Sequence, residues 1–462
     1  MTNKTAVVIM AAGAGTRFKS KRSKLLHDLA GKPAIKYFSD MMSRVKPDQT
    51  IFVLSHQKDE IIKVIGEDKG FDFVEQKVLD GTAGAVRAAV AALKPGITKV
   101  VVLPGDTPTI PDKLVKELIF QDATVILVGT QLEEPEGYGR VKKDESDAVT
   151  GIIEEADLKG GDKEIKHVNT SIYSFNRKFL EKTLSDISKN KNKNEFYLTD
   201  IISLADQQGV EIKYIEHKDP SQVLGANDRL SFSKTALRVW KERAAKHSAN
   251  GVTIIDAEKV YIDEEVKIGK DSEIYPNVFI NGNSEIGEDV LILEGTRINN
   301  SKIAKDSVIG PYVVMDGAQI GEENKIGPFT YIRPGTRTNK KVKIGGFVET
   351  KKITVGECSK IPHLSYVGDA TIGKDVNIGC GVITCNYDGF NKYKTEIGDN
   401  VFIGSDSQLI APVKINSDSY VGAGSTITDE VPQHALAISR VPQKNIKDYV
   451  LKIRAKKKKL AK

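Results

Sequence analysis

The chain has 462 residues, a length that predicts two or three domains rather than a single core. Its composition, 40% hydrophobic and 28% charged, is that of a soluble globular protein and excludes a disordered or fibrous chain. The net charge of +6 does not indicate a nucleic-acid binder, because seven basic residues lie within positions 452–462 and the remaining body carries about −1.

Four short apolar runs, each beside a polar amphipathic stretch, characterise the first half of the chain, up to about residue 228. Buried β-branched runs that alternate with helices predict an α/β, Rossmann-like domain with a mostly parallel sheet. In such folds ligands bind beyond the carboxyl ends of the strands. The predicted strands are Ala6–Met10, Ile51–Leu54, Val100–Leu103 and Thr124–Val128.

Signals for export or membrane insertion are weak in this sequence. The apolar segment Ala6–Ala14 is short and has only Lys4 as a basic flank, so it reads as a buried strand rather than a signal peptide. No apolar stretch approaches the ~20 residues needed to span a bilayer. The cysteines lack metal-ligand spacing and fit a reducing compartment, and we therefore expect a cytoplasmic protein. They are Cys358, Cys380 and Cys385.

The glycine-rich loop after the first predicted strand is a candidate phosphate site. It reads Met-Ala-Ala-Gly-Ala-Gly-Thr-Arg over residues 10–17, and Phe18 occupies the third glycine position of the dinucleotide fingerprint, which excludes that motif. A strand–loop–helix junction still presents backbone N–H groups to an anion, and Arg17 and Lys24 could neutralise a triphosphate. The alternatives are a plain tight turn and two solvated surface cations.

A second candidate group follows the later strands. The run over residues 100–106 ends in Gly-Asp, and a carboxylate at this edge of a central strand is well placed to hold Mg²⁺ on a nucleotide. A turn-forming aspartate would fit Asp106 equally well. Gln76 and the pair Gly81-Thr82 have the donors and the small size that base recognition needs, although in isolation they establish nothing.

Residues 229–250 read as a linking helix with one apolar stripe among Lys and Arg, ended by Asn250-Gly251. The stripe consists of Leu230, Ala236, Leu237, Trp240 and Ala244.

A six-residue aliphatic period dominates the chain after Gly251. Neither a helix nor a hairpin sheet explains this period, whereas a triangular parallel β-helix does: each hexapeptide forms one face and its aliphatic side chain points inward. Glycine follows many of these positions and suits tight turns where a side chain would clash. The predicted inward residues are Ile262, Ile268, Ile274, Ile280, Ile286, Ile292, Ile298, Val308, Val314, Ile320, Ile326, Ile332, Val355, Ile361, Val367, Ile372, Ile378, Ile397, Ile403, Leu409, Ile415, Val421 and Ile427.

Two features of this half suggest chemistry. The polar stretch Thr384–Glu396 interrupts the period and must leave the coil as an external loop, a place where scaffolds often carry function. His363 follows the inward Ile361 and is expected to face outward, where a neutral imidazole can serve as a general base. An ordinary surface histidine is the alternative.

Together, the first-half motifs resemble the sugar-1-phosphate nucleotidyltransferases: Ala-Ala-Gly-x-Gly-Thr-Arg, Ser-Lys-Leu-Leu, Gly-Thr-Ala and Gly-Asp. In that family a sugar phosphate attacks the α-phosphate of a nucleoside triphosphate and pyrophosphate leaves, so the protein mainly positions groups and offsets charge. The resemblance implies phosphate contacts from Arg17 and Lys24, and Mg²⁺ at Asp106 and Asn227. It also implies that Gln76, Gly81 and Thr82 contact the uracil and that Gly139, Glu154 and Asn169 line the sugar site. The whole nucleotide and sugar-phosphate site that it implies consists of Met10, Ala11, Ala12, Gly13, Arg17, Lys24, Gln76, Gly81, Thr82, Gly139, Glu154, Asn169 and Asn227.

The second half extends the resemblance to nearly the whole chain. The succession of residues 347–352, 363–366, 377–379 and 383–389, the last with Asn-Tyr-Asp-Gly, closely resembles the bacterial bifunctional N-acetylglucosamine-1-phosphate uridylyltransferase/glucosamine-1-phosphate acetyltransferases. This implies that His363 takes a proton from the sugar amine as the amine attacks an acetyl thioester. It implies sugar-phosphate contacts from Arg333, Lys351, Tyr366 and Asn377, and acetyl-CoA contacts from Cys380, Asn386, Tyr387, Ser405, Ala423 and Arg440.

The same resemblance implies a homotrimer with active sites at the subunit junctions, which the sequence itself does not show. The basic tail would reach CoA phosphates or a neighbouring subunit, or form a disordered end. Four residues depart from the family pattern and affect the expected affinities rather than the reaction. In this chain Ala14 replaces a lysine, Ser23 a proline, Gly84 a histidine and Cys380 an alanine.

The sequence thus predicts an α/β nucleotidyltransferase domain (1–228), a linking helix (229–250), a left-handed parallel β-helix (251–440) and a basic tail (441–462). The expected function is acetyl transfer to glucosamine 1-phosphate followed by uridylyl transfer from UTP, without nucleic-acid or membrane partners. Two alternatives remain at this point. One is a nucleotidyltransferase whose β-helix only regulates or oligomerises, and the other is a non-enzymatic scaffold with degenerate sites.

Overall fold

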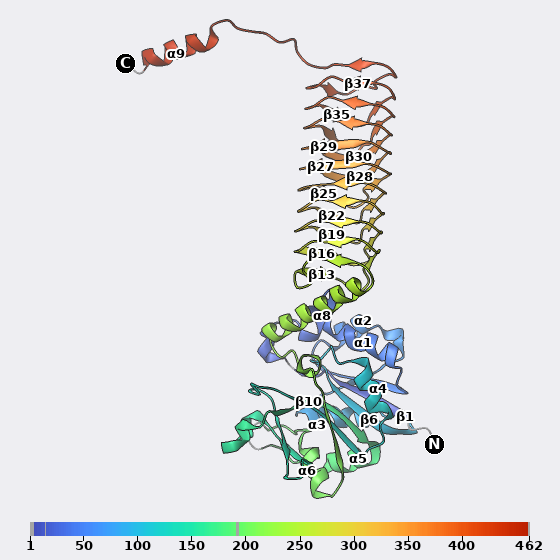
Figure 1. Ribbon diagram of the computed structural model, residues 1–462, viewed down its shortest axis with the longest axis vertical. Coiled ribbons are helices and arrows are strands. Elements are labelled where there is room, and N and C mark those ends of the chain that lie inside the picture. The colour runs from blue at the N-terminus through green and yellow to red at the C-terminus, as the bar shows by residue number, and fades with distance from the viewer. Residues whose placement is uncertain (1–3, 14, 191–193, 461–462) are drawn as a thin grey trace. The chain divides into compact units, whose positions relative to one another are not determined.

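The computed structural model describes residues 4–13, 15–190 and 194–460. The chain divides into two compact units, one up to Val239 and one from Trp240 onward. The helix α8 (Arg229–Ala249) contains this boundary (Figure 1). The departure noted at Ala14 lies outside the described residues.

A nine-stranded mixed sheet forms the first unit, in the order β11-β7-β10-β6-β1-β4-β5, with β8 and β9 joined at β10. All four predicted strands are confirmed as β1, β4, β6 and β7. The sheet is parallel from β6 through β1 and β4 to β5 and between β7 and β11, as predicted, but β10 is antiparallel to β6, β7 and β8, and β8 is antiparallel to β9. The strands are β1 (Lys4–Met10), β4 (Gln49–Leu54), β5 (Asp72–Glu75), β6 (Ile97–Pro104), β7 (Val125–Gln131), β8 (Arg140–Lys143), β9 (Val149–Ile153), β10 (His167–Asn176) and β11 (Ile212–Glu216), with a separate hairpin of β2 (Asp28–Leu29) and β3 (Lys32–Pro33).

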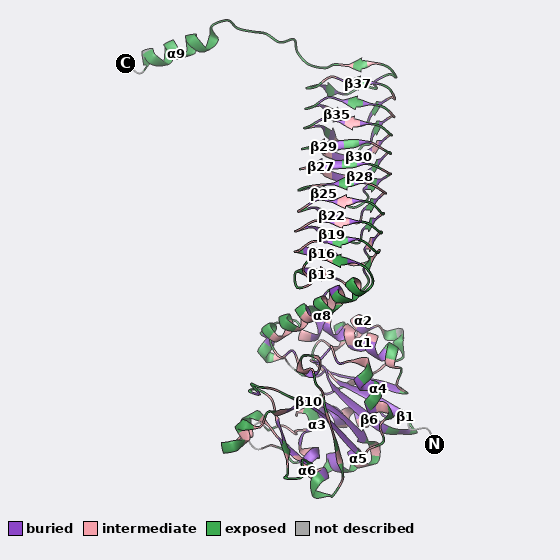
Figure 2. Ribbon diagram, viewed as in Figure 1, coloured by how far each residue is buried: buried purple, intermediate pink, exposed green. Residues whose placement is uncertain are grey.

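Two hydrophobic cores sandwich this sheet, because successive side chains of a strand point to opposite faces. Ala6 and Val8 of β1 pack with α3, α5 and α6, whereas Val7 and Ile9 pack with α1, α2 and α4. The central strands are therefore buried on both sides (Figure 2). The helices are α1 (Ala34–Val45), α2 (Lys58–Ile65), α3 (Thr82–Val90), α4 (Asp112–Phe120), α5 (Arg177–Asp186), α6 (Asp200–Gln207) and α7 (Pro220–Val223), with short 3-10 turns η1 (Thr16–Phe18), η2 (Lys24–Leu26), η3 (Glu67–Lys69), η4 (Glu155–Asp157) and η5 (Gly160–Glu164).

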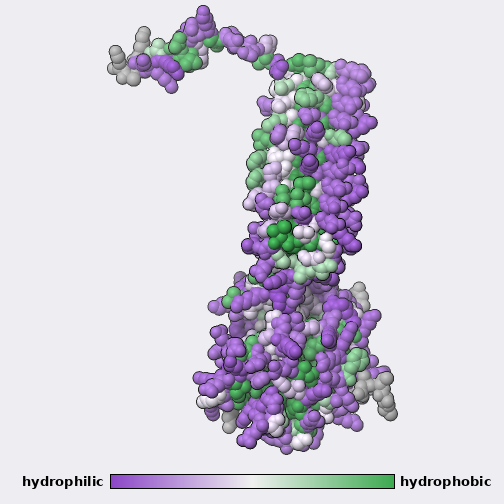
Figure 3. All heavy atoms as spheres, in the orientation of Figure 1, coloured by the Kyte–Doolittle hydropathy of each residue, from purple (hydrophilic) through white to green (hydrophobic). Residues whose placement is uncertain are grey.

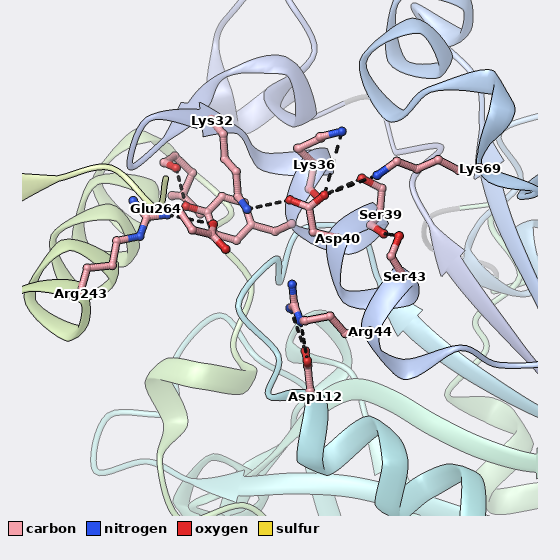
Figure 4. Close-up of polar contacts among 12 residues, drawn as sticks. Lys32, Lys36, Ser39, Asp40, Ser43, Arg44, Lys69, Asp112, Arg243 and Glu264 are labelled. Atoms are coloured by element: carbon pink, nitrogen blue, oxygen red, sulfur yellow. Dashed lines mark hydrogen bonds and ion pairs between the residues drawn. The ribbon is translucent and has the colours of Figure 1, made fainter. Parts of the chain in front are cut away.

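Ion pairs fix helix α1 at the side of the sheet that faces α4 (Figure 4). The carboxylate of Asp40 accepts from Lys32 of β3 at 2.8 Å and lies 3.6 Å from the ammonium of Lys69. Arg44 donates to Asp112, the first residue of α4, at 2.7 Å. These pairs are partly solvated and contribute little stability each, so we assign them the role of orienting α1 rather than of holding the fold together.

The second unit is a left-handed parallel β-helix, as predicted, in which a coil contributes one strand to each of three faces (Figure 1). Face A consists of β12 (Thr253–Ile254), β15 (Glu273–Ile274), β18 (Leu291–Ile292), β21 (Val308–Ile309), β24 (Lys325–Ile326), β27 (Lys343–Gly346), β29 (Lys360–His363), β31 (Asn377–Ile378), β34 (Phe402–Ile403), β37 (Tyr420–Val421) and β39 (Leu436–Ala437). Face B consists of β13 (Val260–Ile262), β16 (Val278–Asn281), β19 (Arg297–Asn299), β22 (Val314–Asp316), β25 (Tyr331–Ile332), the first parts of β28 (Glu349–Val355) and β30 (Tyr366–Ile372), β32 (Ile383–Cys385), β35 (Gln408–Ile410) and β38 (Thr426–Ile427). Face C consists of β14 (Lys267–Ile268), β17 (Glu285–Ile286), β20 (Lys302–Ile303), β23 (Gln319–Ile320), β26 (Arg337–Thr338), the second parts of β28 and β30, β33 (Thr395–Ile397) and β36 (Val413–Ile415).

The inward aliphatic positions are confirmed along most of the coil, with one correction. Ile309 and Met315 are buried at the positions where the period predicted Val308 and Val314, and Val314 is 43% exposed. Register pairs Ile280 with Ile298 but Ile298 with Met315, so these coils shorten from 18 to 17 residues. One face of each 17-residue coil spans five residues, which moves the inward position by one.

The predicted external loop is also visible in the register. Ile372 pairs with Ile397 and Ile378 with Ile403, a step of 25 residues in place of 17 or 18. Thr384 is buried inside the coil, and the excursion runs from Asn386 to Lys394, shorter than the predicted stretch. The loop therefore leaves from the end of face B without disturbing the coils on either side.

The corrected phase gives a stability prediction. Met315→Ala removes a side chain that is 1% exposed, and we expect it to cost about 2–5 kcal/mol and to lower the melting temperature measured by circular dichroism. Val314→Ala, on the neighbouring position, is the matched control and should stay within about 1 kcal/mol because its side chain is outside the core. A larger loss from Val314→Ala than from Met315→Ala would contradict the assigned register.

Helix α8 differs from the predicted stripe at two positions. Ala236 and Ala244 are buried as expected, but Leu230 and Leu237 are 66% and 46% exposed. Beyond the β-helix, the basic tail contains the helix α9 (Tyr449–Leu460), whose described side chains are exposed. None of the described helices has both the length and the apolar character needed to cross a bilayer.

Candidate active sites

A cavity of about 360 Å³ lies at the carboxyl ends of β1, β5 and β6 in the first unit. From β1 the chain continues to β4 and β5 on one side and then crosses to β6 on the other side of β1. Ligands of α/β sheets bind at such a switch point. The lining consists of Met10, Ala11, Ala12, Gly13, Lys24, Leu25, Gln76, Leu79, Gly81, Thr82, Ala85, Pro104, Gly105, Asp106, Ser171 and Glu195. Nine of the predicted site residues therefore meet at one cavity.

Two glycines let backbone segments approach closely at this cavity. A Cβ on Gly105 would lie 2.5 Å from the carbonyl oxygen of Met10, to which the Gly105 N–H donates at 3.0 Å. Gly81 has φ +108° and a Cβ there would lie 2.4 Å from the carbonyl oxygen of Phe196. Since the first contact draws the ends of β6 and β1 together, glycine at position 105 allows Asp106 to lie beside the loop that follows β1.

Lys24 and Arg17 contact the two residues that were expected to bind metal. The ammonium of Lys24 lies 3.0 Å from Oδ2 of Asp106, with the two side chains 15% and 26% exposed. Arg17 donates from Nη2 to Oδ1 of Asn227 at 2.8 Å. The Ala226 N–H donates to the backbone carbonyl of Asp106, which brings the segment before Asn227 alongside Asp106. Of these two cation–oxygen pairs, Lys24–Asp106 lies in the cavity lining, whereas Arg17 and Asn227 are outside it.

The oxygen donors here fit a Mg²⁺ ion that shares its ligands with a phosphate. Within the described ranges, no group of three or more His, Cys, Asp or Glu residues could hold a metal by itself. Mg²⁺ on nucleotides is usually bound by one or two carboxylates together with phosphate oxygens. Asp106 with the amide oxygen of Asn227 supplies such a partial set. Tyr138 lies near this group: burial raises the pKa of its phenol, and the negative charge of Asp106 raises it further.

The predicted sugar residues gather in a second group that is outside the cavity lining. The Asn169 N–H donates to the carbonyl of Gly139 at 2.9 Å, and Thr199 donates to Oε1 of Glu154 at 2.8 Å. Oδ1 of Asn169 accepts from the N–H of Ser171, which does line the cavity. The structure therefore connects this group to the cavity through Ser171.

Several cavity residues were missed by sequence reasoning. Ser171 has φ +59°, unusual for a residue other than glycine, and nothing in the local sequence indicates it. Glu195 comes from a segment more than 80 residues after the strands it faces. The departure at Ser23 also has a structural reason: its N–H donates to Oε1 of Gln57 at 2.5 Å, a bond that a proline could not make.

In the β-helix, one corner between faces A and B carries a column of predicted residues. Register places Gly346 beside His363, and the next coils bring Cys380, Ser405 and Ala423 to the same corner. Backbone hydrogen bonds at the following position support this order: the Asp406 N–H donates to the backbone carbonyl of Cys380, and the Gly424 N–H donates to that of Ser405. All four side chains are exposed, and we call them the His363 column.

Arg440 extends this column at its carboxyl-terminal end. Its Nη1 donates to the carbonyl of Ala423 at 2.7 Å, which places a guanidinium three coils beyond His363. Cys380, the departure from alanine, sits directly between His363 and Ser405 on a solvated surface and so crowds nothing.

A cluster of cations lies on face B beside the column. Arg333 pairs with Glu349 at 2.7 Å, and Lys351 follows Thr350, whose carbonyl accepts the Arg333 N–H. Lys392, and then Arg333, lower the pKa of the Lys351 ammonium, because like charges disfavour its protonated form. Three cations thus face one small area, a natural site for a phosphate.

Lys392 was missed by sequence reasoning, since only the folded loop brings it to Lys351. The loop is a tight turn in which Tyr387 bridges to Lys392 and Asp388 accepts the N–H groups of Phe390 and Asn391. These two bonds lower the pKa of the Asp388 carboxyl. Asn386 anchors the base of the loop by donating to Oδ2 of Asp369 at 2.5 Å.

One predicted sugar residue is not brought together with the others. Tyr366 follows Glu349 by register on face B, close to Arg333 and Lys351. Asn377 lies on face A between Lys360 and Phe402, on the other side of the His363 corner. Within one chain the predicted acetyltransferase site is therefore split across two faces.

Comparisons with known proteins match both halves. Residues 6–240 match the nucleotidyl transferase family, residues 257–344 the GMPPB C-terminal domain, and residues 394–429 the bacterial transferase hexapeptide (six repeats). Proteins named bifunctional protein GlmU are 40% identical in Acetivibrio thermocellus (96% of this chain, 97% of the relative) and in Carboxydothermus hydrogenoformans (96% and 99%). That of Brevibacillus brevis is 38% identical over 99% of both chains. A chain that shares this identity over its whole length, with both transferase halves present, belongs to the family of bifunctional GlmU proteins.

Proposed function

We propose that each unit of this bifunctional enzyme carries one of its two reactions, at the residues described above. The β-helix transfers acetyl from acetyl-CoA to glucosamine 1-phosphate. The α/β unit then transfers uridylyl from UTP to N-acetylglucosamine 1-phosphate and releases pyrophosphate, giving a precursor of cell-wall peptidoglycan and lipopolysaccharide. Two observations support this assignment: nine of the residues expected for uridylyl transfer line one cavity of the first unit, and His363 lies at the same corner of the β-helix as Cys380, Ser405 and Ala423, three of the residues expected to contact acetyl-CoA.

For uridylyl transfer, the residues of the first unit bind, orient and offset charge. The N–H groups of residues 11–13 and the side chains of Arg17 and Lys24 bind the phosphates, and Gln76 and Thr82 hold the uracil. Asp106 and Asn227 would hold Mg²⁺, which offsets phosphate charge when bound. Arg17 and Lys24 exchange these two partners for phosphate oxygens when the nucleotide enters.

For acetyl transfer, His363 accepts the proton of the sugar amine as its nitrogen attacks the thioester carbonyl. The C–N bond forms, the C–S bond breaks, and the CoA thiolate leaves and is protonated. Arg333, Lys351 and Lys392 bind the sugar phosphate, and Tyr366 its hydroxyls. Acetyl-CoA lies along the His363 column, where it contacts Cys380, Asn386, Tyr387, Ser405, Ala423 and Arg440.

A homotrimer in the cytoplasm completes the proposal. Exposed rings of Tyr312, Phe329 and Phe347 stack along the same corner at 5.2 and 5.4 Å, and hydrophobic and hydrophilic residues separate on the β-helix surface in Figure 3. A neighbouring subunit that covers this corner would bring its Asn377 to the Arg333–Lys351–Tyr366 group. Sedimentation equilibrium of the purified protein should give three times the chain mass, and a monomer with full acetyltransferase activity would contradict this arrangement.

The direct test of the proposed function uses the purified protein with glucosamine 1-phosphate, acetyl-CoA, UTP and Mg²⁺. Mass spectrometry should detect UDP-N-acetylglucosamine, free CoA and pyrophosphate. If a nucleotide sugar forms only from pre-acetylated sugar phosphate and no CoA is released, the β-helix does not act as an acetyltransferase. Failure to bind UTP with Mg²⁺ would instead support the scaffold alternative.

The role given to Lys392 makes a separate prediction. Lys392→Ala should raise the KM for glucosamine 1-phosphate about tenfold, because one charge-assisted contact to the phosphate is lost, and should leave the KM for acetyl-CoA within about twofold. Lys394→Ala is the matched control, since this nearby cation lies 3.8 Å from Glu396 and away from Lys351. If the two variants change the KM for glucosamine 1-phosphate equally in a steady-state assay, Lys392 does not bind the sugar phosphate.

A further inference from the structure

Gln76 is held in one orientation at the wall of the cavity. Its side chain is 7% exposed, and its Nε2 donates to Oδ1 of Asp80 at 3.1 Å and to the backbone carbonyl of Gly81 at 3.0 Å. Carboxylate and carbonyl oxygens only accept hydrogen bonds, so the NH₂ end of the amide must face them. Both amide hydrogens are then used, and Oε1 is the group that Gln76 can offer to a ligand.

Asp80 occupies space that exists because residue 84 is glycine. A Cβ on Gly84 would lie 1.7 Å from Oδ1 of Asp80 and 2.6 Å from its carboxyl carbon. This explains the departure from histidine at position 84: in this chain the carboxylate of Asp80 fills the place above the first turn of α3. A side chain at position 84 would therefore displace the carboxylate of Asp80.

The backbone around Asp80 is fixed from the opposite segment. The Phe196 N–H donates to the carbonyl of Asp80 at 2.7 Å, and the Ala83 N–H donates to the carbonyl of Phe196 at 3.0 Å. Thr82 accepts the Leu198 N–H at 2.9 Å. A carboxylate on so constrained a backbone can orient its partner before any ligand arrives, which reduces the ordering cost of binding.

We propose that Asp80 is a positioning residue for base selection: it fixes the Gln76 amide so that an oxygen acceptor faces the base, and Gly84 provides the space. This rests on the proposed placement of uracil at Gln76. An acceptor at that point binds the N3–H of uracil but meets the lone pair of N3 in cytosine. Asp80 therefore raises the preference for UTP over CTP without touching the nucleotide.

Asp80→Ala tests this role. We expect the KM for UTP to rise about tenfold and the preference for UTP over CTP, measured as a ratio of kcat/KM, to fall about tenfold, with kcat changed less than about threefold. Asp80→Asn is the matched control, because its amide oxygen can still accept from Gln76, and it should retain most of the preference. A merely structural role would lower the melting temperature without changing the UTP-to-CTP ratio.

Gly84→Ala tests the coupling from the other side. The added methyl displaces the carboxylate, so the variant should lose UTP preference as Asp80→Ala does, and the double variant should lose no more than either single one. Gly161→Ala is the control, since a Cβ there meets no atom within 4 Å. Additive losses in the double variant would contradict the coupling.

The outcomes separate this inference from the proposed function. If the parent protein transfers uridylyl but Asp80→Ala keeps the parent KM and UTP-to-CTP ratio, Asp80 does not position Gln76 and only this inference fails. If the parent protein makes no nucleotide sugar and does not bind UTP, the proposed function fails first. Loss of UTP binding in Gln76→Ala but not in Asp80→Ala would likewise retain the uracil site and overturn the role of Asp80.

Discussion

Replacement of His363 by alanine should abolish acetyl transfer while uridylyl transfer continues at the parent rate. The imidazole is exposed at the corner where Cys380, Ser405 and Ala423 stack, and it is the base that we propose for the attacking amine. Loss of a general base costs roughly 10²–10⁴-fold in rate. The measurement is release of free CoA thiol from acetyl-CoA with glucosamine 1-phosphate, beside pyrophosphate release from UTP with the pre-acetylated sugar phosphate.

His434→Ala is the matched control for this variant. His434 is the other histidine of the β-helix, exposed in its last coil, and its replacement should change neither activity more than about twofold. A His363→Ala protein that retains acetyl transfer, or that is folded but loses both reactions, would contradict a base confined to the second unit.

Asp106→Ala should have the opposite effect, with uridylyl transfer reduced roughly 10²–10³-fold and acetyl transfer unchanged. Its carboxylate is the anionic member of the proposed metal pair and the partner of Lys24 at 3.0 Å, so the variant weakens metal binding and leaves a cation without its partner. A positioned charge at the reacting phosphates contributes this much to catalysis in other enzymes. Pyrophosphate release is to be followed over a Mg²⁺ titration, where the variant should need higher Mg²⁺.

Asp112→Ala controls for the loss of a partly exposed aspartate in the same unit, since its carboxylate pairs with Arg44 of α1 and is not part of the cavity lining (Figure 4). It should keep both activities. If Asp106→Ala binds and uses Mg²⁺–UTP as the parent does, the assignment of the cavity mouth to phosphates and metal is wrong.

The repeat of the second half was visible in the sequence because it follows from local geometry. An aliphatic at every sixth residue is the direct consequence of a coil with three flat faces, and a 13-residue polar interruption can only be accommodated outside the coil. The error at Val308 and Val314 has an equally plain origin. A coil shortened to 17 residues keeps the period but moves its phase, and Ile309 and Met315 were adjacent aliphatic alternatives.

The strands of the first half and the location of its cavity were predictable for a related reason. Buried parallel strands are continuous apolar runs, and Gly-rich or Gly-Asp turns at their carboxyl ends converge at one edge of the sheet. The motifs at residues 10–17 and at Asp106 were therefore placed together before the fold was known. The contacts of Lys24 with Asp106 and of Arg17 with Asn227 could not be predicted, since they join residues 82 and 210 positions apart.

The sequence by itself thus determined the two architectures, the strand ends at the first candidate site and the histidine proposed for the second. These depend on patterns within a few turns or coils of chain. Only the tertiary structure decided which side chains meet: Lys392 with Lys351, Ser171 with the cavity, and Asp80 in the space above Gly84. Such contacts depend on loop conformation and on packing between distant segments, and side-chain packing in a close-packed interior is decided by volumes and backbone positions that no local pattern encodes.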